Sequence, residues 1–291
     1  MNILKETTYS CIIDFIREFR GLSIECEVEL IKRYPRISKD TLKSIMTIEV
    51  TTKTRNLFHK YKSRVTELLE KYEKLQQSSS PSNDRLLLQI AIENSIPPGI
   101  LCRLVLQEKY KSKNLQKSEL AEMLKCYHLI DDPDFAANIR MCSMNDNQDG
   151  IIVDMRRRCL GEEYEVKLKK CARDCGISFF DENDLRRTGF DKTPDLKLVL
   201  PCLYKGCVVN WIESKALFGD IKTHRKYLTQ QLESYHNRFG PGIVIYWFGY
   251  HENLRTLKDN PNGLIILNKF PEREHLFFLT ENSDTQSTSN S

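Results

Sequence analysis

The sequence has 291 residues and a mass of 34.1 kDa, about twice the length of a typical single domain, so two domains, or one domain with a substantial appendage, are expected. Apolar residues make up 40% of the chain and charged residues 29%, which excludes collagen-like, wholly disordered and disulfide-scaffold proteins. The net charge of +4 allows a nucleic-acid partner, but any binding surface must then be a local patch.

Targeting signals and cysteine chemistry point to a soluble intracellular protein. No apolar run approaches the roughly 18 residues that a membrane span needs, and the N-terminal residues lack the basic-then-apolar arrangement of a secretory signal. The ten cysteines include no CxxC pair, so reduced thiols are expected rather than zinc ligands or disulfides. We therefore expect the protein in the nucleus and cytoplasm.

The first 76 residues show helical periodicity. Short helices are predicted at 8–20, 23–33 and 38–48, with Ser38 as an N-cap, and a long amphipathic helix is predicted at 54–76. Two short helices joined by a tight turn are typical of a helix-turn-helix, but they are also common as simple packing units. DNA contact and protein docking therefore both remain open for residues 1–76.

A polar segment at residues 77–84 predicts a linker, and a second helical unit is expected at 85–150. This unit has the same two interpretations as the first, a contact with DNA or a scaffold for protein docking. Its helices are predicted at 84–94, 97–110 and 118–127, with a further one from Asp134.

The pattern changes after the polar segment 145–150, because strands now alternate with helices. Together these elements predict an α/β domain at 151–280, a mixed sheet flanked by helices, followed by a disordered tail at 281–291. The strands are predicted at 195–201, 207–215, 242–250 and 263–268, and the helices at 162–174 and 221–238.

The predicted hairpin at residues 195–215 carries two carboxylates and an ammonium group. Alternation along a strand directs Glu213 and Lys215 to the same face, and a turn at residues 205–206 brings Asp195 near Glu213. Two neighbouring carboxylates repel each other unless a cation lies between them, and Mg²⁺ prefers such oxygen ligands. The hairpin therefore predicts a magnesium site at which Lys215 stabilises negative charge or positions a water.

The strings Thr193-Pro194-Asp195 and Glu213-Ser214-Lys215 resemble the core motif of the PD-(D/E)xK nuclease superfamily, and in particular its TPD-motif branch related to archaeal Holliday-junction resolvases. The resemblance implies a restriction-endonuclease-like fold and a DNA endonuclease that uses Mg²⁺ or Mn²⁺. It further implies a structured or branched substrate, a homodimer and, from animal members, a role in erythropoiesis with codanin as a protein partner.

The resemblance also implies an acidic residue on the helix that precedes the first strand, and helical geometry selects it. Glu165 lies closest to the buried face that Tyr164 and Leu168 define, so we expect it to be the third carboxylate, which orients a metal-bound water. Gln231 and Tyr235 match a Gln-x-x-x-Tyr pair of some superfamily members, which implies contacts with substrate phosphate or with the attacking water.

Basic side chains near these positions are candidates for substrate binding. His224 lies on the same predicted helical edge as Gln231, beside Lys222, Arg225 and Lys226, and we expect these four residues to contact phosphate groups. A structural His and ordinary solvated lysines are the alternatives. Two other functions also remain open: RNA cleavage by the same chemistry, and a scaffold that retains the nuclease fold and works mainly by binding codanin.

Overall fold

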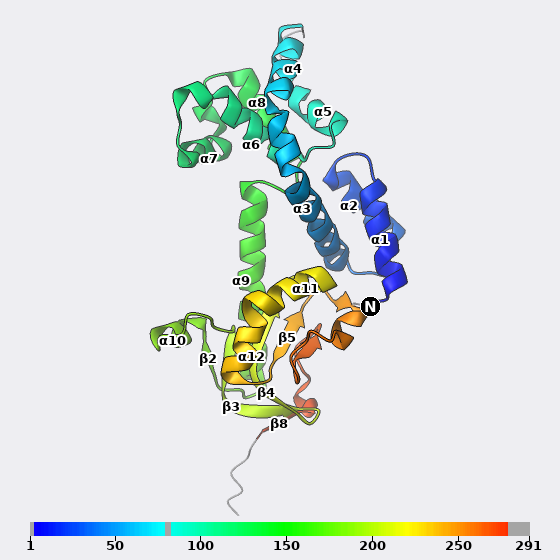
Figure 1. Cartoon of the computed structure of the whole chain (residues 1–291), viewed down its shortest axis with the longest axis vertical. Helices are drawn as coiled ribbons and strands as arrows, with labels where there is room; N and C mark the ends of the chain where they lie inside the picture. Colours follow the sequence, from blue (N-terminus) through cyan, green and yellow to red (C-terminus); the bar gives the residue numbers. More distant parts are fainter. Residues whose placement is uncertain (1–2, 79–82, 279–291) are drawn as a thin grey trace, which may run out of the picture. The chain divides into compact units, whose positions relative to one another are not determined.

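The computed structural model describes residues 3–78 and 83–278 (Figure 1). Residues 7–160 form one compact unit, and residues 3–6 join residues from 161 onwards in a second. The chain therefore passes between the units twice. Within the described residues, no helix is long and apolar enough to cross a membrane. The predicted tail at 281–291 and the middle of the predicted linker lie outside this part of the chain.

The first unit is built from helices, which agrees with the helical N-terminal half expected from the sequence. Its helices are α1 (Glu6–Glu18), α2 (Ser23–Arg33), α3 (Lys39–Ser63), α4 (Val65–Ser78), α5 (Leu86–Glu93), α6 (Pro98–Lys109), η1 (Lys111–Lys113), α7 (Lys117–Lys125), η2 (Tyr127–Leu129), α8 (Pro133–Met144) and the first part of α9 (Ile151–Asp174).

The long helix of this unit begins and ends differently from the prediction. Ser38 is the expected N-cap, since its hydroxyl accepts a hydrogen bond from the backbone N–H of Thr41 at 3.1 Å. The helix then continues to Ser63, because no glycine or proline interrupts the chain there, and it breaks at Arg64. The predicted helices at 38–48 and 54–76 are therefore replaced by α3 and α4, with the break moved by about a dozen residues.

One apolar core joins the residues on both sides of the predicted linker. Tyr72 of α4 is fully buried, and its ring packs against Phe135 of α8 with 5.5 Å between the ring centroids. The same cluster includes Leu68 before the linker and Leu101 and Ile139 after it. The polar segment at 77–84 is therefore a connection within one unit and does not separate two cores.

The second unit contains a mixed sheet in the order β2-β3-β4-β5-β7, with β8 paired to β3. β3 is antiparallel to β2, β4 and β8, while β4-β5 and β5-β7 are parallel. This is the mixed α/β fold expected from the sequence. Its elements are β2 (Phe179–Asp181), α10 (Glu182–Arg187), β3 (Leu196–Tyr204), β4 (Cys207–Lys215), α11 (Ile221–Tyr227), η3 (Leu228–Leu232), α12 (Glu233–Phe239), β5 (Ile243–Tyr246), β6 (Tyr250–His251), η4 (Glu252–Thr256), β7 (Ile265–Leu267), η5 (Arg273–His275) and β8 (Leu276–Phe278).

Helices pack on both faces of this sheet, and the side chains of β4 alternate between contacts with the two layers of helices. Trp211 faces α12 and packs against Tyr235, with ring centroids 5.5 Å apart. Ser214 points to the other face, where its hydroxyl accepts a hydrogen bond from Trp247 Nε1 at 2.8 Å. Trp247 in turn packs against Tyr164 of α9 at 5.3 Å. Odd-numbered positions of β4 therefore face α11–α12, and the even-numbered Ser214 faces α9.

The first described residues belong to the second unit, which the sequence did not predict. The two-residue strand β1 (Ile3–Leu4) pairs in parallel with β6. Glu6 extends this contact, because its carboxylate lies 2.9 Å from Nε2 of the buried His251 and its backbone N–H donates to Glu252 at 2.9 Å. Residues 3–6 therefore form a strap on the second unit.

Glycine substitutions test the packing of this sheet. A methyl group at Gly242 would lie 2.3 Å from ring atoms of the fully buried Trp211, whereas one at Gly161 in α9 would meet nothing within 4 Å. We expect Gly242→Ala to lower the free energy of unfolding by roughly 1–3 kcal/mol through overpacking. We expect the control Gly161→Ala to raise it by about 0.5–1 kcal/mol, because alanine favours a helix interior. Urea unfolding monitored by tryptophan fluorescence measures both, and equal effects would contradict this packing.

Candidate active site

The β3–β4 hairpin brings the two strand carboxylates together, as the spacing in the sequence predicted. Lys205 and Gly206 form its turn with φ angles of +49° and +82°, which suits a tight hairpin connection. Leu196 then pairs with Ile212, so Asp195 lies opposite Glu213.

Backbone hydrogen bonds fix both carboxylates in this position. Asp195 Oδ2 accepts from the backbone N–H of Ser214 at 2.7 Å, and Glu213 Oε2 accepts from the backbone N–H of Asp195 at 3.2 Å. Each strand therefore holds the acidic side chain of the other. Glu213 is only 4% exposed, so these hydrogen bonds are shielded from bulk water.

Lys215 lies in the same group and is held by three side chains. Its Nζ donates to Glu213 Oε1 at 2.6 Å and to Gln231 Oε1 at 2.8 Å. The ammonium group also lies 4.6 Å from the centre of the Tyr227 ring, a cation–π contact. The structure therefore brings together four of the predicted residues, Asp195, Glu213, Lys215 and Gln231, and adds Tyr227, which no sequence motif indicated.

A π-helical turn explains why Gln231 contacts Lys215 whereas Tyr235 is buried in the core. The sequence predicted one regular helix at 221–238, but the five residues of η3 form a wider turn that offsets the residues after it. Gln231 then reaches Lys215, while Tyr235 is 3% exposed and packs in the core against Trp211. Burial raises the pKa of Tyr235, and the charges of Glu213 and Asp195 raise it further. Tyr235 thus lies in the electrostatic field of the two carboxylates.

The protonation states of the site follow from burial and charge. Burial, with the negative charge of Glu213, holds the pKa of Asp195 well above its usual range. For Lys215, burial alone would lower the pKa, but the charge of Glu213 and its hydrogen bond outweigh burial and raise the pKa. Lys215 is therefore positively charged at neutral pH, and it interacts electrostatically with both Glu213 and Asp195.

The residues fit a hard divalent cation. Asp195 and Glu213 present carboxylate oxygens from adjacent strands, which are the ligands that Mg²⁺ and Mn²⁺ prefer. Burial is the main reason that the pKa of Asp195 is raised, and the neighbouring charge of Glu213 raises it further. A further positive charge between these oxygens would relieve that repulsion.

Glu165 lies near this pair without touching it. Its side chain is exposed on α9, and partial burial raises its pKa, followed by the charges of Glu182 and Glu213. The charge of Glu165 likewise contributes to the raised pKa of Asp195. Glu182, the first residue of α10, is thus a further acidic neighbour, which could not be predicted because no periodic pattern links it to α9.

His224 is a structural residue, which corrects its predicted role in substrate binding. The ring is fully buried, and its two nitrogens lie 2.7 Å from the Tyr246 hydroxyl and 2.8 Å from Asn260 Oδ1. With both nitrogens used inside the fold, no ring atom remains for a phosphate. The helical edge on which the prediction rested faces the core at this position.

The basic residues predicted beside His224 are exposed on α11. Arg225 forms an ion pair with Asp259 at 2.9 Å, which offsets its charge. Lys222 and Lys226 have no ion pair within the described residues. Their predicted contacts with substrate phosphate therefore remain predictions.

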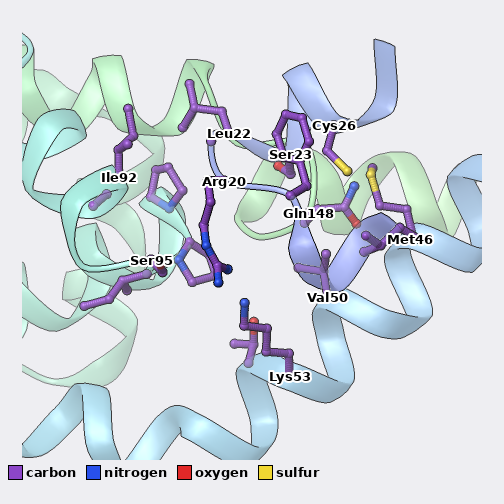
Figure 2. A pocket seen from close by; sticks show the side chains of 18 of the residues that line it. Arg20, Leu22, Ser23, Cys26, Met46, Val50, Lys53, Ile92, Ser95 and Gln148 are labelled. Carbon is purple, nitrogen blue, oxygen red and sulfur yellow. The ribbon is translucent and has the colours of Figure 1, made fainter. Parts of the chain in front are cut away.

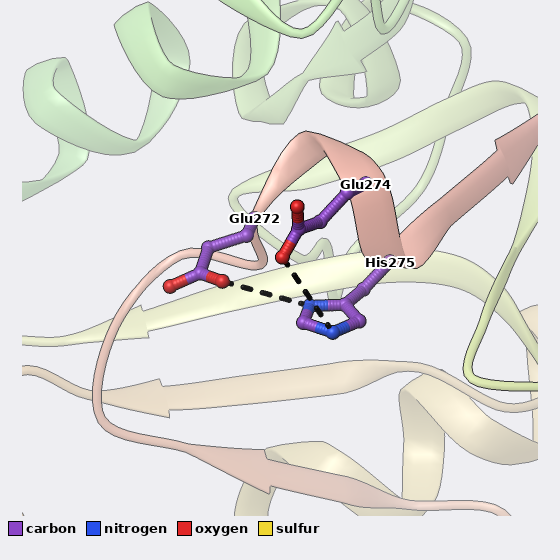
Figure 3. A group of neighbouring side chains, drawn as sticks. All are labelled: Glu272, Glu274 and His275. Carbon is purple, nitrogen blue, oxygen red and sulfur yellow. Dashed lines mark ion pairs between the residues drawn. The ribbon is translucent and has the colours of Figure 1, made fainter.

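A second group of acidic and histidine side chains lies in η5 and at Glu272, the residue that precedes it (Figure 3). Glu272 and Glu274 lie 3.8 and 4.0 Å from ring nitrogens of His275. Among the described residues, this is the only set of three such side chains whose ligand atoms all lie within 4.8 Å of one another. All three are solvent-accessible, and Glu272 is already paired with Lys269, so these contacts are surface ion pairs and we assign no metal to them.

The model of a family described as "Protein of unknown function TPD sequence-motif" matches residues 131–270. The chain is 35% identical over 274 residues to CDAN1-interacting nuclease 1 of Xenopus laevis, covering 92% of this chain and 89% of the relative. It is 34% identical to the proteins of that name from Danio rerio, over 90% and 88% of the two chains, and Homo sapiens, over 84% and 87%. No solved structure matches the chain.

The buried imidazole predicts how stability depends on pH. Burial lowers the pKa of His224 below its ordinary value of 6.5, so below that pH the unfolded chain binds a proton that the folded chain does not. Stability is therefore full above about pH 6.5 and falls as the pH drops below it. We expect His224→Gln to flatten this part of the profile, measured by urea unfolding between about pH 7 and pH 5. An equal slope in both proteins would contradict the assignment.

Proposed function

Because the chain belongs to the family of CDAN1-interacting nuclease 1, we propose that it is a metal-dependent nuclease that hydrolyses phosphodiester bonds at Asp195, Glu213 and Lys215. The observation that carries this proposal is the convergence of two hydrogen-bonded carboxylates and a protonated lysine at one end of a hairpin. This arrangement also supports membership of the PD-(D/E)xK superfamily.

The carboxylates of Asp195 and Glu213 would hold the metal, with Mg²⁺ or Mn²⁺ as the ion. When bound, such an ion acts as a Lewis acid for the scissile phosphate and lowers the pKa of a coordinated water. Glu165 contributes a third carboxylate, which we assign to orienting that water. Glu165 is exposed on α9, and its charge contributes to the raised pKa of Asp195.

Lys215 stabilises negative charge on the phosphate or positions the attacking water. An ammonium group has three N–H donors, and Glu213 and Gln231 use two of them, so one remains for an oxygen of the substrate. Gln231 and Tyr227 are positioning residues, since they fix Lys215. Tyr235 supports the site from the core through its packing on Trp211.

We propose DNA as the substrate, with a structured or branched form preferred and a homodimer as the acting species. Phosphate contacts carry little sequence information, so recognition by shape is the consistent mechanism. Lys222 and Lys226 supply exposed charge near the site, and Lys167 adds a cation that lies over the Trp247 ring at 4.7 Å. The helices α2 and α3 are the pair to test for helix-turn-helix contacts with DNA.

A second function follows from the relatives, whose name states that they interact with CDAN1. We propose codanin as a partner of this chain, in the nucleus and cytoplasm. A scaffold that works only through this partner is the alternative to catalysis. The intact set of Asp195, Glu213 and Lys215 favours the enzyme, because an unused cluster of like charges destabilises its host.

Cleavage assays test the nuclease. We expect the purified protein to cut flap, fork or four-way-junction DNA with Mg²⁺ or Mn²⁺ but not with EDTA. We expect Asp195→Asn and Glu213→Ala each to reduce the rate by at least about a hundredfold, since each removes a metal ligand. Glu165→Gln should slow cleavage more than the matched control Glu162→Gln, an exposed glutamate on the same helix. Equal rates for wild type and Asp195→Asn would contradict the assignment, and single-stranded DNA and RNA complete the substrate panel.

Thermal unfolding tests the metal site without activity. Asp195→Asn keeps an oxygen acceptor for the Ser214 N–H but removes one of two repelling charges, so we expect its Tm without metal to exceed that of wild type by roughly 2–4 °C. Mg²⁺ or Mn²⁺ should raise the Tm of wild type, because the ion binds only the folded site, and should leave the variant unchanged. Equal metal-induced shifts in both proteins would place the ion elsewhere.

A further inference from the structure

The helical unit contains a cavity of about 240 Å³ that none of the preceding functions uses. It opens among α1, α2, α3 and α5 and the loop before α6, and most of its wall is apolar (Figure 2). Figure 2 shows Ile92 and Ser95 on one side, with Met46 and Val50 on the other. Pockets that enclose a whole drug-sized ligand span about 300–1,000 Å³, so this one suits an anchoring side chain rather than a complete molecule.

Two cationic side chains meet at this cavity without an acidic partner. The ends of Arg20 and Lys53 point toward each other from different elements (Figure 2), and neither forms an ion pair within the described residues. The third cation of the lining, Arg17, is neutralised by Glu49 at 2.7 Å. Both side chains are exposed at the cavity, and an anionic group between them would interact favourably with both charges.

A buried acceptor lines the same cavity. Gln148 is 6% exposed, and its Nε2 donates to Asn147 at 3.0 Å. Its Oε1 is buried and has no hydrogen-bond partner among the described residues, and the same holds for the hydroxyl of Ser23. In Figure 2, Gln148 lies between Ser23 and Met46. An unsatisfied buried acceptor costs about 1–3 kcal/mol, which a ligand with an N–H or O–H donor would recover.

We propose that this cavity docks a protein partner through an extended segment in which a large apolar residue is flanked by Asp or Glu. The apolar side chain fills the cavity, a backbone N–H of the segment donates to Gln148 Oε1, and an acidic side chain lies between Arg20 and Lys53. Each of the three features on the cavity wall is thereby satisfied by one part of the same segment.

The observations favour this ligand over two others. A fatty acid supplies an apolar chain and a carboxylate but has no donor for Gln148. A DNA phosphate satisfies Arg20 and Lys53 but leaves the apolar wall and Gln148 without a partner. A peptide segment supplies all three groups, and it enters with the backbone donors that such recognition uses.

Selection of random phage-displayed peptides on the full-length chain tests this proposal. We expect the enriched peptides to share a Leu, Ile, Phe or Trp beside Asp or Glu. Fluorescence anisotropy then gives their affinity for wild type and variants. We expect Arg20→Glu/Lys53→Glu to weaken binding by at least about tenfold, and Gln148→Leu by about fivefold. The matched control Lys60→Glu/Lys62→Glu has the same charge change on exposed residues of α3 outside the cavity, and it should bind like wild type.

A charge-swapped peptide keeps the test decisive if a variant binds poorly for other reasons. Replacing the acidic residues of an enriched peptide with Lys should abolish binding to wild type and restore it to Arg20→Glu/Lys53→Glu. The proposal is overturned if no apolar–acidic consensus is enriched, or if binding survives both cavity variants. It is also overturned if labelled duplex DNA, rather than peptide, distinguishes Arg20→Glu/Lys53→Glu from the control. None of these outcomes depends on cleavage at Asp195.

Discussion

The candidate active site depends on a reciprocal pair of hydrogen bonds across one hairpin. Asp195 accepts from the backbone of β4, and Glu213 accepts from the backbone N–H just before β3, so each carboxylate is positioned by the backbone of the neighbouring strand. Because the strands pair in fixed register, the positions of the two acidic side chains are as rigid as the sheet itself. Lys215, Gln231 and Tyr227 are then placed relative to this pair, through the ammonium group that Glu213 attracts.

This arrangement costs stability, and the surrounding fold offsets that cost. Asp195 and Glu213 place like charges in a shielded setting, which is why the pKa of Asp195 is held above its usual range. The core next to them is dense, since Trp211, Tyr235 and Tyr246 are almost completely buried and pack in one cluster. A polar site with like charges on a densely packed apolar support is the expected compromise between function and stability.

The sequence predicted the parts of this site that depend on local spacing, and it failed where contacts are non-local. Asp195 and Glu213 could be paired because a tight turn and strand alternation determine their positions. The π-helical turn could not be predicted, because no residue pattern distinguishes it from a regular helix, so the role of Tyr227 was missed. His224 was misassigned for a related reason: a helical wheel locates its edge but not the Tyr246 and Asn260 groups that surround it.

The strap formed by residues 3–6 gives the second unit a discontinuous sequence. A fragment that starts at Gly161 would lack β1 and would expose the edge of β6 to water. It would also leave the buried His251 without the carboxylate of Glu6, which lies 2.9 Å away. A protease that cuts α9 once would therefore leave an N-terminal fragment that is still bound to the second unit by the strap. Excision of an intact second unit would require a tether that restores residues 3–6, such as a circular permutation of the chain.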